Sequence, residues 1–383
     1  MDNLIVDDRE YFDKFRQFDH LVCYGAGSKG LQTLELLKKK GINVDYFVDS
    51  YRDKWGTKWG GIETVGYEEI RKLKRYCIVI TTVYSTALEI EENLRKKGEQ
   101  NPIFFCANPF KSEVRFLTRQ EAMSEDGVNK TLEILHDEKS KKIWVDFINW
   151  KITGCHSYTT KYTEGGWLEF FDSNVVPYKE DYTYIDIGAY TGDTILRFLA
   201  FCHGKFKKIL AFEPDETNYV RLLSFVNDGR LPVEKVDMIK SGLWSEEKDL
   251  SFYSAGDGDK YESSNFFNDT SLILPAERKE TGHSSADNIL HVKKLDQFDD
   301  LISGNVLMKI DALSSEHEIL VGAAETIRKN KPVIVMELGT RYDRLFETVP
   351  FLRSLNKDYL FYVRQLRSFD NSRTIMIARN KDD

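Results

Sequence analysis

Short apolar runs alternate with amphipathic stretches in a first region, from Asp19 to Pro109. The runs LVCY, VDYFVDS, YCIVITT and NPIFFC predict four strands, and the segments LQTLELLKKKG and ALEIEENLRKKG carry apolar residues at helical spacing. Alternating strands and helices are typical of a parallel sheet with helices on its faces. We therefore expect a first Rossmann-like domain in residues 1–110.

A second region, from Pro177 to the end, repeats this architecture. Its predicted strands are YTYIDIG, KKILAFEP, DMIKSGLWS, NVLMKID and KPVIVMELG, with YLFYVRQL and RTIMIAR as a closing pair. The helices between them are ILRFLAFC, ETNYVRLLSFVND and EHEILVGAAETIRKN. Residues 254–288 are rich in Ser, Asn, Asp and Gly, which predicts a long loop. The pattern predicts a second domain in residues 177–383.

The segment between the two regions, residues 111–176, is charged and has a helical period. Leu132 and Leu135 share one helical face, and a second apolar stripe consists of Ile143, Trp144, Phe147 and Ile148. We expect a helical connector. The predicted fold class is thus α/β, with two Rossmann-like domains of mostly parallel sheets joined by this connector.

Composition narrows the class of protein. The 383 residues are 41% hydrophobic and 30% charged, as in a globular protein. The net charge of −8 argues against a main task of binding nucleic acid. No apolar stretch is long enough to span a membrane, and the start MDNLIVDDREYFDKF lacks the basic and apolar parts of a secretion signal. The five cysteines form no C-x-x-C pair, so we expect reduced thiols in a cytoplasmic protein and no metal site.

A glycine-containing turn joins the first strand and first helix of the second region. In IDIGAYTGDT, Gly188 allows a sharp turn and Gly192 lets a ligand approach the start of the helix. Asp186, just before the turn, can accept a hydrogen bond from an amine or hydroxyl. The next strand is followed by Glu213, 21 residues after Gly192, where an acidic residue is placed to bind ribose hydroxyls. The spacing G-x-x-x-G differs from the dinucleotide pattern and favours a nucleoside with a sulfonium tail over NAD.

These motifs, in this order, resemble the FkbM family of methyltransferases. The resemblance rests on IDIGAYTGDT, AFEPDETNYVRL, MKID and EHEILVGA, and it extends upstream to HDEKS, WLEFFD and the N-terminal Rossmann-like domain. It implies S-adenosylmethionine as the cofactor, lined by Asp186, Gly188, Gly192, Glu213, Ser241 and Leu243. The first three would lie at its methionine end, Glu213 at the ribose, and the last two beside the adenine. Family members mostly O-methylate hydroxyls of glycans and natural products, which implies a role in polysaccharide biosynthesis.

One motif departs from the family. The fourth strand is usually followed by a run like D-V-E-G-A-E, whereas this chain has Asp311-Ala312-Leu313-Ser314-Ser315-Glu316. The first Asp and the last Glu match, but Leu313 and Ser314 replace the Glu-Gly pair. We expect either a changed acceptor pocket or weaker catalysis, while the residues that bind the cofactor are unaffected.

The chemistry of methyl transfer suggests which groups catalyse it. The reaction is an in-line displacement accelerated by positioning, and an alcohol acceptor must also lose its proton to a base. Asp311, after the fourth strand, is the first candidate for base or acceptor anchor, with a helix cap as the alternative. Glu337, which otherwise binds acceptor hydroxyls, and His317, which otherwise is structural, are second candidates. A divalent cation shared by Asp311 and Glu337 is disfavoured because no third ligand is evident.

A second glycine-rich turn lies in the first domain. Gly25, Gly27 and Gly30 match G-x-G-x-x-G between a strand and a helix, and Asp49 closes the next strand, 19 residues after Gly30. This fingerprint looks like the Rossmann domains of sugar-modifying enzymes, which take a nucleotide-sugar. No Tyr-x-x-x-Lys pair for hydride chemistry follows the strand that ends in Thr81-Thr82. We therefore expect a domain that binds a nucleotide or sugar, with a domain that only packs as the alternative.

The sequence thus predicts an S-adenosylmethionine-dependent O-methyltransferase acting on a hydroxyl of a sugar or glycan intermediate. Two alternatives remain open. One is a nucleotide-sugar oxidoreductase or epimerase that uses the N-terminal fingerprint. The other is a non-catalytic, cofactor-binding assembly protein, which the departures at Leu313 and Ser314 suggest. Trp55, Trp59 and Trp167 lie in glycine-containing loops, where core anchoring is the more general expectation than stacking on sugars.

Overall fold

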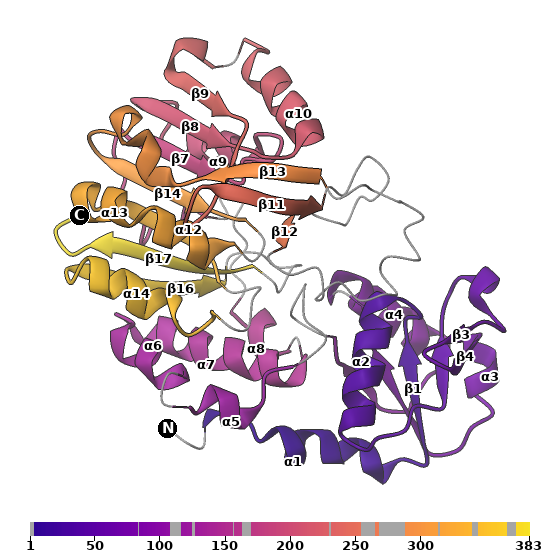
Figure 1. The fold of residues 1–383 in the computed structure, drawn as a ribbon. Coiled ribbons are helices and arrows are strands. Elements are labelled where there is room, and N and C mark those ends of the chain that lie inside the picture. Colours follow the sequence, from indigo (N-terminus) through magenta and orange to yellow (C-terminus); the bar gives the residue numbers. More distant parts are fainter. Residues whose placement is uncertain are drawn as a thin grey trace. The chain divides into compact units, whose positions relative to one another are not determined.

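The chain divides into two compact units. A computed structural model describes residues 4–82, 84–107, 116–124, 127–155, 157–162, 170–229, 231–253, 265–267, 288–312, 315–338, 344–365 and 373–383. Unit 1 consists of Met1–Asn129, Lys142–Thr163 and Arg367–Ser372, and unit 2 of Lys130–Lys141, Glu164–Leu366 and Arg373–Asp383. Each unit has a mostly parallel sheet with helices between its strands, which confirms the predicted α/β class (Figure 1). The predicted boundaries 1–110, 111–176 and 177–383 stay a prediction.

The sheet of unit 1 has the strand order β3-β4-β2-β1-β5-β6. Its strands are β1 (His20–Tyr24), β2 (Tyr46–Val48), β3 (Lys58–Trp59), β4 (Ile62–Val65), β5 (Tyr76–Ile80) and β6 (Ile103–Phe105). Neighbouring strands are parallel except for the β3–β4 hairpin, which the sequence patterns did not predict. Alternate residues of β1 and β5 enter two separate apolar clusters, so both faces of the sheet are covered.

The helices of unit 1 include two short ones from the segment that the sequence predicts to be a helical connector. They are α1 (Asp8–Asp13), η2 (Lys14–Gln17), α2 (Ser28–Lys39), η3 (Arg52–Lys54), α3 (Tyr67–Ile70), α4 (Tyr84–Lys96), α5 (Arg119–Ala122) and α8 (Ser157–Thr160). Both units contribute residues to α6 (Val128–Ile134) and α7 (Glu138–Thr153). The apolar stripe of α7 is buried, and Trp144 stacks on Phe147 with ring centroids 5.8 Å apart.

The main sheet of unit 2 has the order β16-β17-β15-β14-β7-β8-β9. Its strands are β7 (Thr183–Ile187), β8 (Lys208–Phe212), β9 (Val236–Ile239), β14 (Val306–Ile310), β15 (Val333–Glu337), β16 (Tyr359–Gln365) and β17 (Thr374–Asn380). They correspond to the seven predicted strands, and β17 runs antiparallel to both neighbours. Strands β7, β14 and β15 are buried along their whole length, as expected for central strands covered on both faces.

Helices and a small second sheet complete unit 2. The helices are α9 (Asp193–Phe201), α10 (Glu216–Val226), η4 (Val233–Lys235), η6 (Leu295–Leu301), α12 (Glu316–Gly322), α13 (Ala324–Asn330) and α14 (Thr348–Leu355). The second sheet has the order β10-β13-β11-β12 and contains β10 (Gly242–Leu243), β11 (Lys248–Tyr253), β12 (Asn265–Phe267) and β13 (Asn288–Lys293). The long loop predicted for residues 254–288 lies mostly outside the described residues, and β12 falls within it. In the part of the chain that the structure describes, no helix has both the length and the apolar character that crossing a membrane requires.

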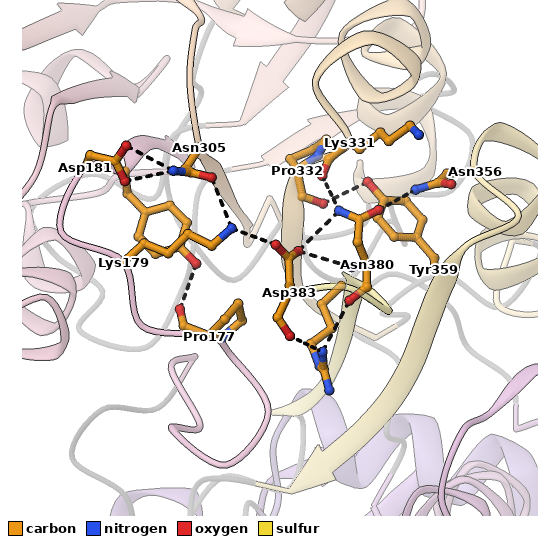
Figure 2. Close-up of polar contacts among 12 residues, drawn as sticks. Pro177, Lys179, Asp181, Asn305, Lys331, Pro332, Asn356, Tyr359, Asn380 and Asp383 are labelled. Carbon is orange, nitrogen blue, oxygen red and sulfur yellow. Dashed lines mark hydrogen bonds and ion pairs between the residues drawn. The ribbon is translucent and has the colours of Figure 1, made fainter.

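A polar network fastens the amino ends of the central strands of unit 2 (Figure 2). Lys179, before β7, donates to Asn305 Oδ1 at 3.0 Å and pairs with Asp383 at 2.6 Å. Asn380, at the end of β17, donates to the backbone oxygen of Lys331 at 2.8 Å, just before β15. These side chains bond to protein groups, so we assign the amino edge of the sheet a role in holding the strands together. The carboxyl ends of the parallel strands lie at the opposite edge.

Candidate functional site

The predicted site residues of unit 2 gather at the carboxyl edge of its main sheet. Strands β7, β8, β9, β14 and β15 are parallel, so their ends point to the same edge. Gly188, Glu213, Ser241, Asp311 and Glu337 end these strands or follow them by one or two residues. Ligands of open α/β sheets bind at this edge, because the loops there come from adjacent strands.

The turn after β7 requires its glycines for packing reasons. Gly188 has φ +76°, and a Cβ there would lie 2.1 Å from the backbone oxygen of Asp311. Gly192 has φ +91°, and a Cβ would lie 2.4 Å from the ring of Phe225 on α10. Tyr190, between them, also has positive φ (+51°), and its side chain is 51% exposed. The chain therefore holds three left-handed residues in one short turn, which persists only where neighbours fix it.

Glu213 is buried beside this turn. Its Oε2 accepts from the backbone N–H of Tyr190 at 2.8 Å, and its Oε1 accepts from that of Asp215 at 3.0 Å. The side chain is 5% exposed, and burial raises its pKa to about 7 although both N–H groups favour the ionised form. Each carboxylate oxygen can accept a further bond. The carboxyl of Glu213 would therefore accept hydrogen bonds from the hydroxyls of a ligand, and it ionises near neutral pH.

Asp186 occupies the centre of the edge, but it bonds to protein groups. It is fully buried on β7, its Oδ2 accepts from Thr194 Oγ1 at 2.6 Å, and its Oδ1 lies 3.0 Å from Lys309 Nζ. Burial raises the pKa of Asp186, while the ammonium of Lys309 opposes that shift. One oxygen of Asp186 is thus hydrogen-bonded within the protein, and the other forms an ion pair with Lys309.

Ser241 and Leu243 lie after β9, as the resemblance implies for residues near an adenine. The hydroxyl of Ser241 donates to the backbone oxygen of Gly242 at 2.9 Å, and the residue is 8% exposed. Leu243 is buried in β10, whose backbone pairs with Lys293 of β13. Leu243 therefore belongs to the small second sheet, and Ser241 stands between the two sheets.

The acceptor-side candidates Asp311 and Glu337 share one guanidinium. Arg373 Nη1 donates to Asp311 Oδ2 and lies 3.4 Å from Glu337 Oε2. Glu337 is fully buried at the end of β15, and the Asp311 side chain is 14% exposed. The guanidinium of Arg373 thus lies between the two carboxylates. Within the described ranges, no cluster of three or more His, Cys, Asp or Glu side chains is arranged for a metal.

His317 packs against α14. Its Nδ1 is 3.4 Å from Thr348 Oγ1, its Nε2 is 3.7 Å from Glu347 Oε2, and its ring is 5.5 Å from that of Phe351. These contacts attach α12 to α14, and they fit the structural role that the sequence left open for this histidine.

The motif that departs from the family is described only at its ends. Leu313 and Ser314 lie outside the described residues. Glu316, which matches the family, is buried, and its Oε1 accepts from the backbone N–H of Ala312 at 3.3 Å. This hydrogen bond connects the start of α12 to Ala312, the residue directly after Asp311.

Two residues of this edge were not predicted from the sequence. Lys309 is an isolated lysine in the apolar strand VLMKI, and a charged residue within a run that reads as buried was the available signal. Arg373 gave no such signal. It reaches the carboxyl edge because β17 is antiparallel, so the start of this strand lies beside the ends of the others.

The second glycine turn, in unit 1, follows the dinucleotide pattern closely. A Cβ at Gly30 would lie 2.2 Å from the backbone oxygen of Gly25, so helix α2 packs tightly on the turn. Gly25 has φ +118° and lies against Thr81 and Thr82. Around Gly27, by contrast, a Cβ would meet no atom within 4 Å. A tight turn, an open approach and a close helix contact are the three roles of these glycines in dinucleotide-binding folds.

Asp49, the acidic residue of this fingerprint, is held by protein groups. Its Oδ2 accepts from the backbone N–H of Ala26 and from Lys54 Nζ, each at 3.0 Å, and its Oδ1 accepts from the backbone N–H of Tyr51 at 3.0 Å. Lys54 Nζ also donates to the backbone oxygen of Ala26 at 2.8 Å. An ammonium therefore lies directly at the glycine turn.

Two of the three predicted loop tryptophans are described. Trp55 is 42% exposed, and its Nε1 donates to the backbone oxygen of Asp49 at 2.8 Å. Trp59 packs on the core cluster of one sheet face. Trp167 lies outside the described residues.

Comparison with family models identifies the family to which the domain in unit 2 belongs. Residues 186–363 match the methyltransferase FkbM domain, which spans the glycine turn, Glu213, Asp311 and Glu337. Residues 186–363 are an FkbM methyltransferase domain. The predicted resemblance is confirmed, and the protein is a methyltransferase. Residues 18–104, which contain the second glycine turn, match the family described as C2185-like, N-terminal.

Solved structures agree with the fold. A methyltransferase FkbM from Methylobacillus flagellatus KT is 16% identical, with a TM-score of 0.64 over 98% of this chain and 94% of that chain. This match supports the fold of the FkbM domain and of the N-terminal part together. No curated protein matches the chain.

Two further structures resemble only parts of the chain. A precorrin-6y C5,15-methyltransferase from Geobacter metallireducens GS-15 is 13% identical, with a TM-score of 0.30 over 55% of this chain and 84% of that chain. A UDP-D-quinovosamine 4-dehydrogenase from Vibrio fischeri is 22% identical, with a TM-score of 0.20 over 23% of this chain and 76% of that chain. TM-scores this low support no conclusion about the fold or the function of either region.

Proposed function

We propose that this methyltransferase uses S-adenosylmethionine to O-methylate a hydroxyl, on a sugar or glycan intermediate. The observation that carries the proposal is Glu213, a buried carboxylate fixed by the glycine turn at the carboxyl edge of the sheet. An acid at the end of the second strand is the position from which such folds bind a ribose diol.

The groups around Glu213 fit the cofactor. Its carboxylate keeps lone pairs for two hydroxyl donors, while the N–H groups of Tyr190 and Asp215 hold it in place. Ser241 lies on the adenine side, and the backbone of residues 188–190 lies on the methionine side. When bound, S-adenosylmethionine supplies an electrophilic methyl group with its own leaving group. The protein then has to orient the two reactants and exclude water.

The acceptor belongs on the other half of the edge, beside Asp311 and Glu337. Arg373 holds both carboxylates in position, and carboxylate oxygens are acceptors suited to the hydroxyls of a polyol. Asp311, which directly follows β14 next to the turn, is the candidate to take the proton of the reacting hydroxyl. Glu337 then binds a neighbouring hydroxyl and orients the acceptor.

Replacing Glu213 tests this proposal. We expect Glu213→Ala to weaken binding of S-adenosylhomocysteine at least about tenfold in calorimetry, because a charged hydrogen-bond acceptor contributes roughly 1.5–3 kcal/mol. Glu216→Gln, three residues on and exposed, is the matched control and keeps wild-type affinity. Equal affinity in wild type and Glu213→Ala contradicts the assignment. Mass spectrometry of candidate glycans incubated with S-adenosylmethionine then identifies the product, and a methyl group on nitrogen or carbon would contradict O-methylation.

For unit 1 we propose a nucleotide ligand, of the nucleotide-sugar class, at the turn of Gly25, Gly27 and Gly30. The open space at Gly27 and the ammonium of Lys54 beside the turn support an anionic ligand. A cytoplasmic location is also proposed, since all five cysteines are free thiols, as expected in a reducing compartment.

A further inference from the structure

Lys309 is a fully buried lysine in the middle of the main sheet of unit 2. It lies on β14 directly beside Asp186 of β7 in the parallel register, and its side chain is 1% exposed. Its ammonium forms an ion pair with Asp186 Oδ1 at 3.0 Å and donates to the backbone oxygens of Gly188 at 2.7 Å and Ile187 at 3.3 Å. The charge of Lys309 is therefore compensated inside the protein.

The ion pair of Lys309 with Asp186 is not, by itself, evidence of a large contribution to stability. A buried ion pair contributes little to stability on average, because removing two charges from water offsets their attraction. Burial favours the neutral amine, yet the carboxylates of Asp186, Asp311 and Asp193 hold the pKa of Lys309 above its usual value. The side chain is thus a fixed positive charge beneath the glycine turn.

The contacts of Lys309 lead to Glu213 in two steps. Lys309 binds the carbonyl of Gly188, the first of the left-handed residues in the turn. Two residues later, the N–H of Tyr190 donates to Glu213. A turn with such backbone angles needs external bonds to keep its shape, and Lys309 supplies one to its first carbonyl and another to the last residue of β7.

We infer that Lys309 is a positioning residue of the cofactor site, which holds the glycine turn from below so that Tyr190 and Glu213 meet the nucleoside. This inference rests on the function proposed above. It also assigns Asp186 a role through Lys309 and the turn, since its carboxylate forms an ion pair with the ammonium that holds the Gly188 carbonyl.

Lys309 also acts on Glu213 through its charge. Burial and the carboxylate of Asp215 raise the pKa of Glu213, whereas the two backbone N–H groups and the charge of Lys309 lower it. A lysine too far from Glu213 to act on it would leave the titration of Glu213 unchanged. This electrostatic link therefore provides a readout that loss of stability alone does not move.

The test is the affinity for S-adenosylhomocysteine, measured by calorimetry from pH 5.5 to 9 in wild type and in Lys309→Met. We expect the variant to bind at least about tenfold more weakly at pH 7, with the pH of half-maximal affinity shifted upward by up to about one unit. Lys151→Met is the matched control, because Lys151 of α7 is equally buried in unit 1. It should lower the melting temperature and leave both quantities unchanged.

We expect Lys309→Met to fold, because Asp186, which pairs with Lys309 in the wild type, can become neutral by protonation. Burial already raises the pKa of Asp186, so without Lys309 this carboxyl takes up a proton and no isolated charge remains. Lys309→Gln is the second variant, with an amide that can still donate to a carbonyl but carries no charge. It should show the same upward shift with a smaller loss of affinity.

The outcomes separate the two proposals. Wild type that fails to bind S-adenosylhomocysteine at any pH overturns the proposed function and this inference with it. Wild type that binds, together with Lys309 variants of unchanged affinity and unchanged pH midpoint, overturns the inference alone. A lower melting temperature with an unmoved midpoint identifies Lys309 as structural only.

Discussion

A Cβ on Gly188 would lie 2.1 Å from the backbone oxygen of Asp311, so the turn after β7 and the loop after β14 touch at this glycine. The first of these segments belongs to the proposed cofactor half of the edge, and the second to the acceptor half. Their spacing is therefore set by backbone against backbone, which has no side-chain freedom to absorb a change.

Gly188→Ala should accordingly destabilise the protein by about 3 kcal/mol in urea unfolding, since it combines a positive φ with a backbone clash. Gly204→Ala is the matched control: φ is +72° there, but a Cβ would meet nothing within 4 Å. It should lose only about 1 kcal/mol. Equal losses in the two variants would show that the contact with Asp311 is unimportant.

The affinity for S-adenosylhomocysteine should depend on pH through Glu213. The pKa of this carboxyl is raised to about 7 in the unliganded protein, and ribose hydroxyls that donate to the ionised form would lower it on binding. Binding then releases a proton, so affinity rises as pH increases from about 5 to about 7 and levels off above that range. Calorimetry in buffers of different ionisation enthalpy measures the released proton directly.

Glu213→Gln is the control for this pH dependence, because its amide does not titrate. Its affinity should be lower and nearly independent of pH between 5 and 8. A wild-type affinity that falls with rising pH over the same range would mean that the ligand prefers the protonated carboxyl, contrary to the proposed contact.

Asp311→Asn should slow methyl transfer by about 100-fold or more while S-adenosylhomocysteine binding stays within about twofold of wild type. The reason is that an amide cannot take up the proton of the acceptor hydroxyl but occupies the same space. Single-turnover rates and calorimetry measure the two effects separately. Full activity in this variant removes Asp311 as the base.

Arg373→Met should raise KM for the acceptor more than it changes cofactor affinity. Without the guanidinium, the carboxylates of Asp311 and Glu337 lose the group that holds them in place. Steady-state kinetics with each substrate varied in turn gives the comparison. If cofactor affinity and acceptor KM change by the same factor, the division of the edge into two halves is wrong.

Gly27→Val should abolish binding of a nucleotide-sugar to unit 1 and leave the melting temperature within about 1 °C. The backbone there is extended and nothing lies within 4 Å of the added Cβ, so the fold has room where the new side chain begins, while a ligand that approaches the turn meets that side chain. Calorimetry with nucleotide-sugars and with NAD provides the measurement. Oxidation or epimerisation of the sugar in the presence of NAD would instead favour the oxidoreductase alternative, and absence of any ligand would favour a domain that only packs.

Much of the fold was predictable because its strands are continuous apolar runs. Each of the central strands β1, β5, β7, β14 and β15 is covered on both faces and reads as such in the sequence. The β3–β4 hairpin was missed because strands of two and four residues leave too little pattern to detect. The long helix predicted from Glu316 to Asn330 is divided at Ala323 into α12 and α13, directly after Gly322, a helix-breaking signal that the periodic pattern on either side concealed.

The site residues that directly follow a strand in the sequence were predictable. Gly188, Glu213 and Asp311 each come directly after a recognisable parallel strand, so topology alone brings them to one edge. Arg373 depends on the antiparallel direction of β17, which the residues of that strand do not reveal. The pairing of Asp186 with Lys309 depends on the register between β7 and β14, which is set by packing and has no local signal.

The reversed strand β17 has a consequence for how this enzyme can diversify. Because β17 starts where its neighbours end, Arg373 contacts Asp311 and Glu337, while β15, β14 and β7 separate β17 from β8 and β9. Substitutions at Arg373 therefore offer a route to new acceptor preferences in which the residues proposed to bind the methyl donor are inherited unchanged.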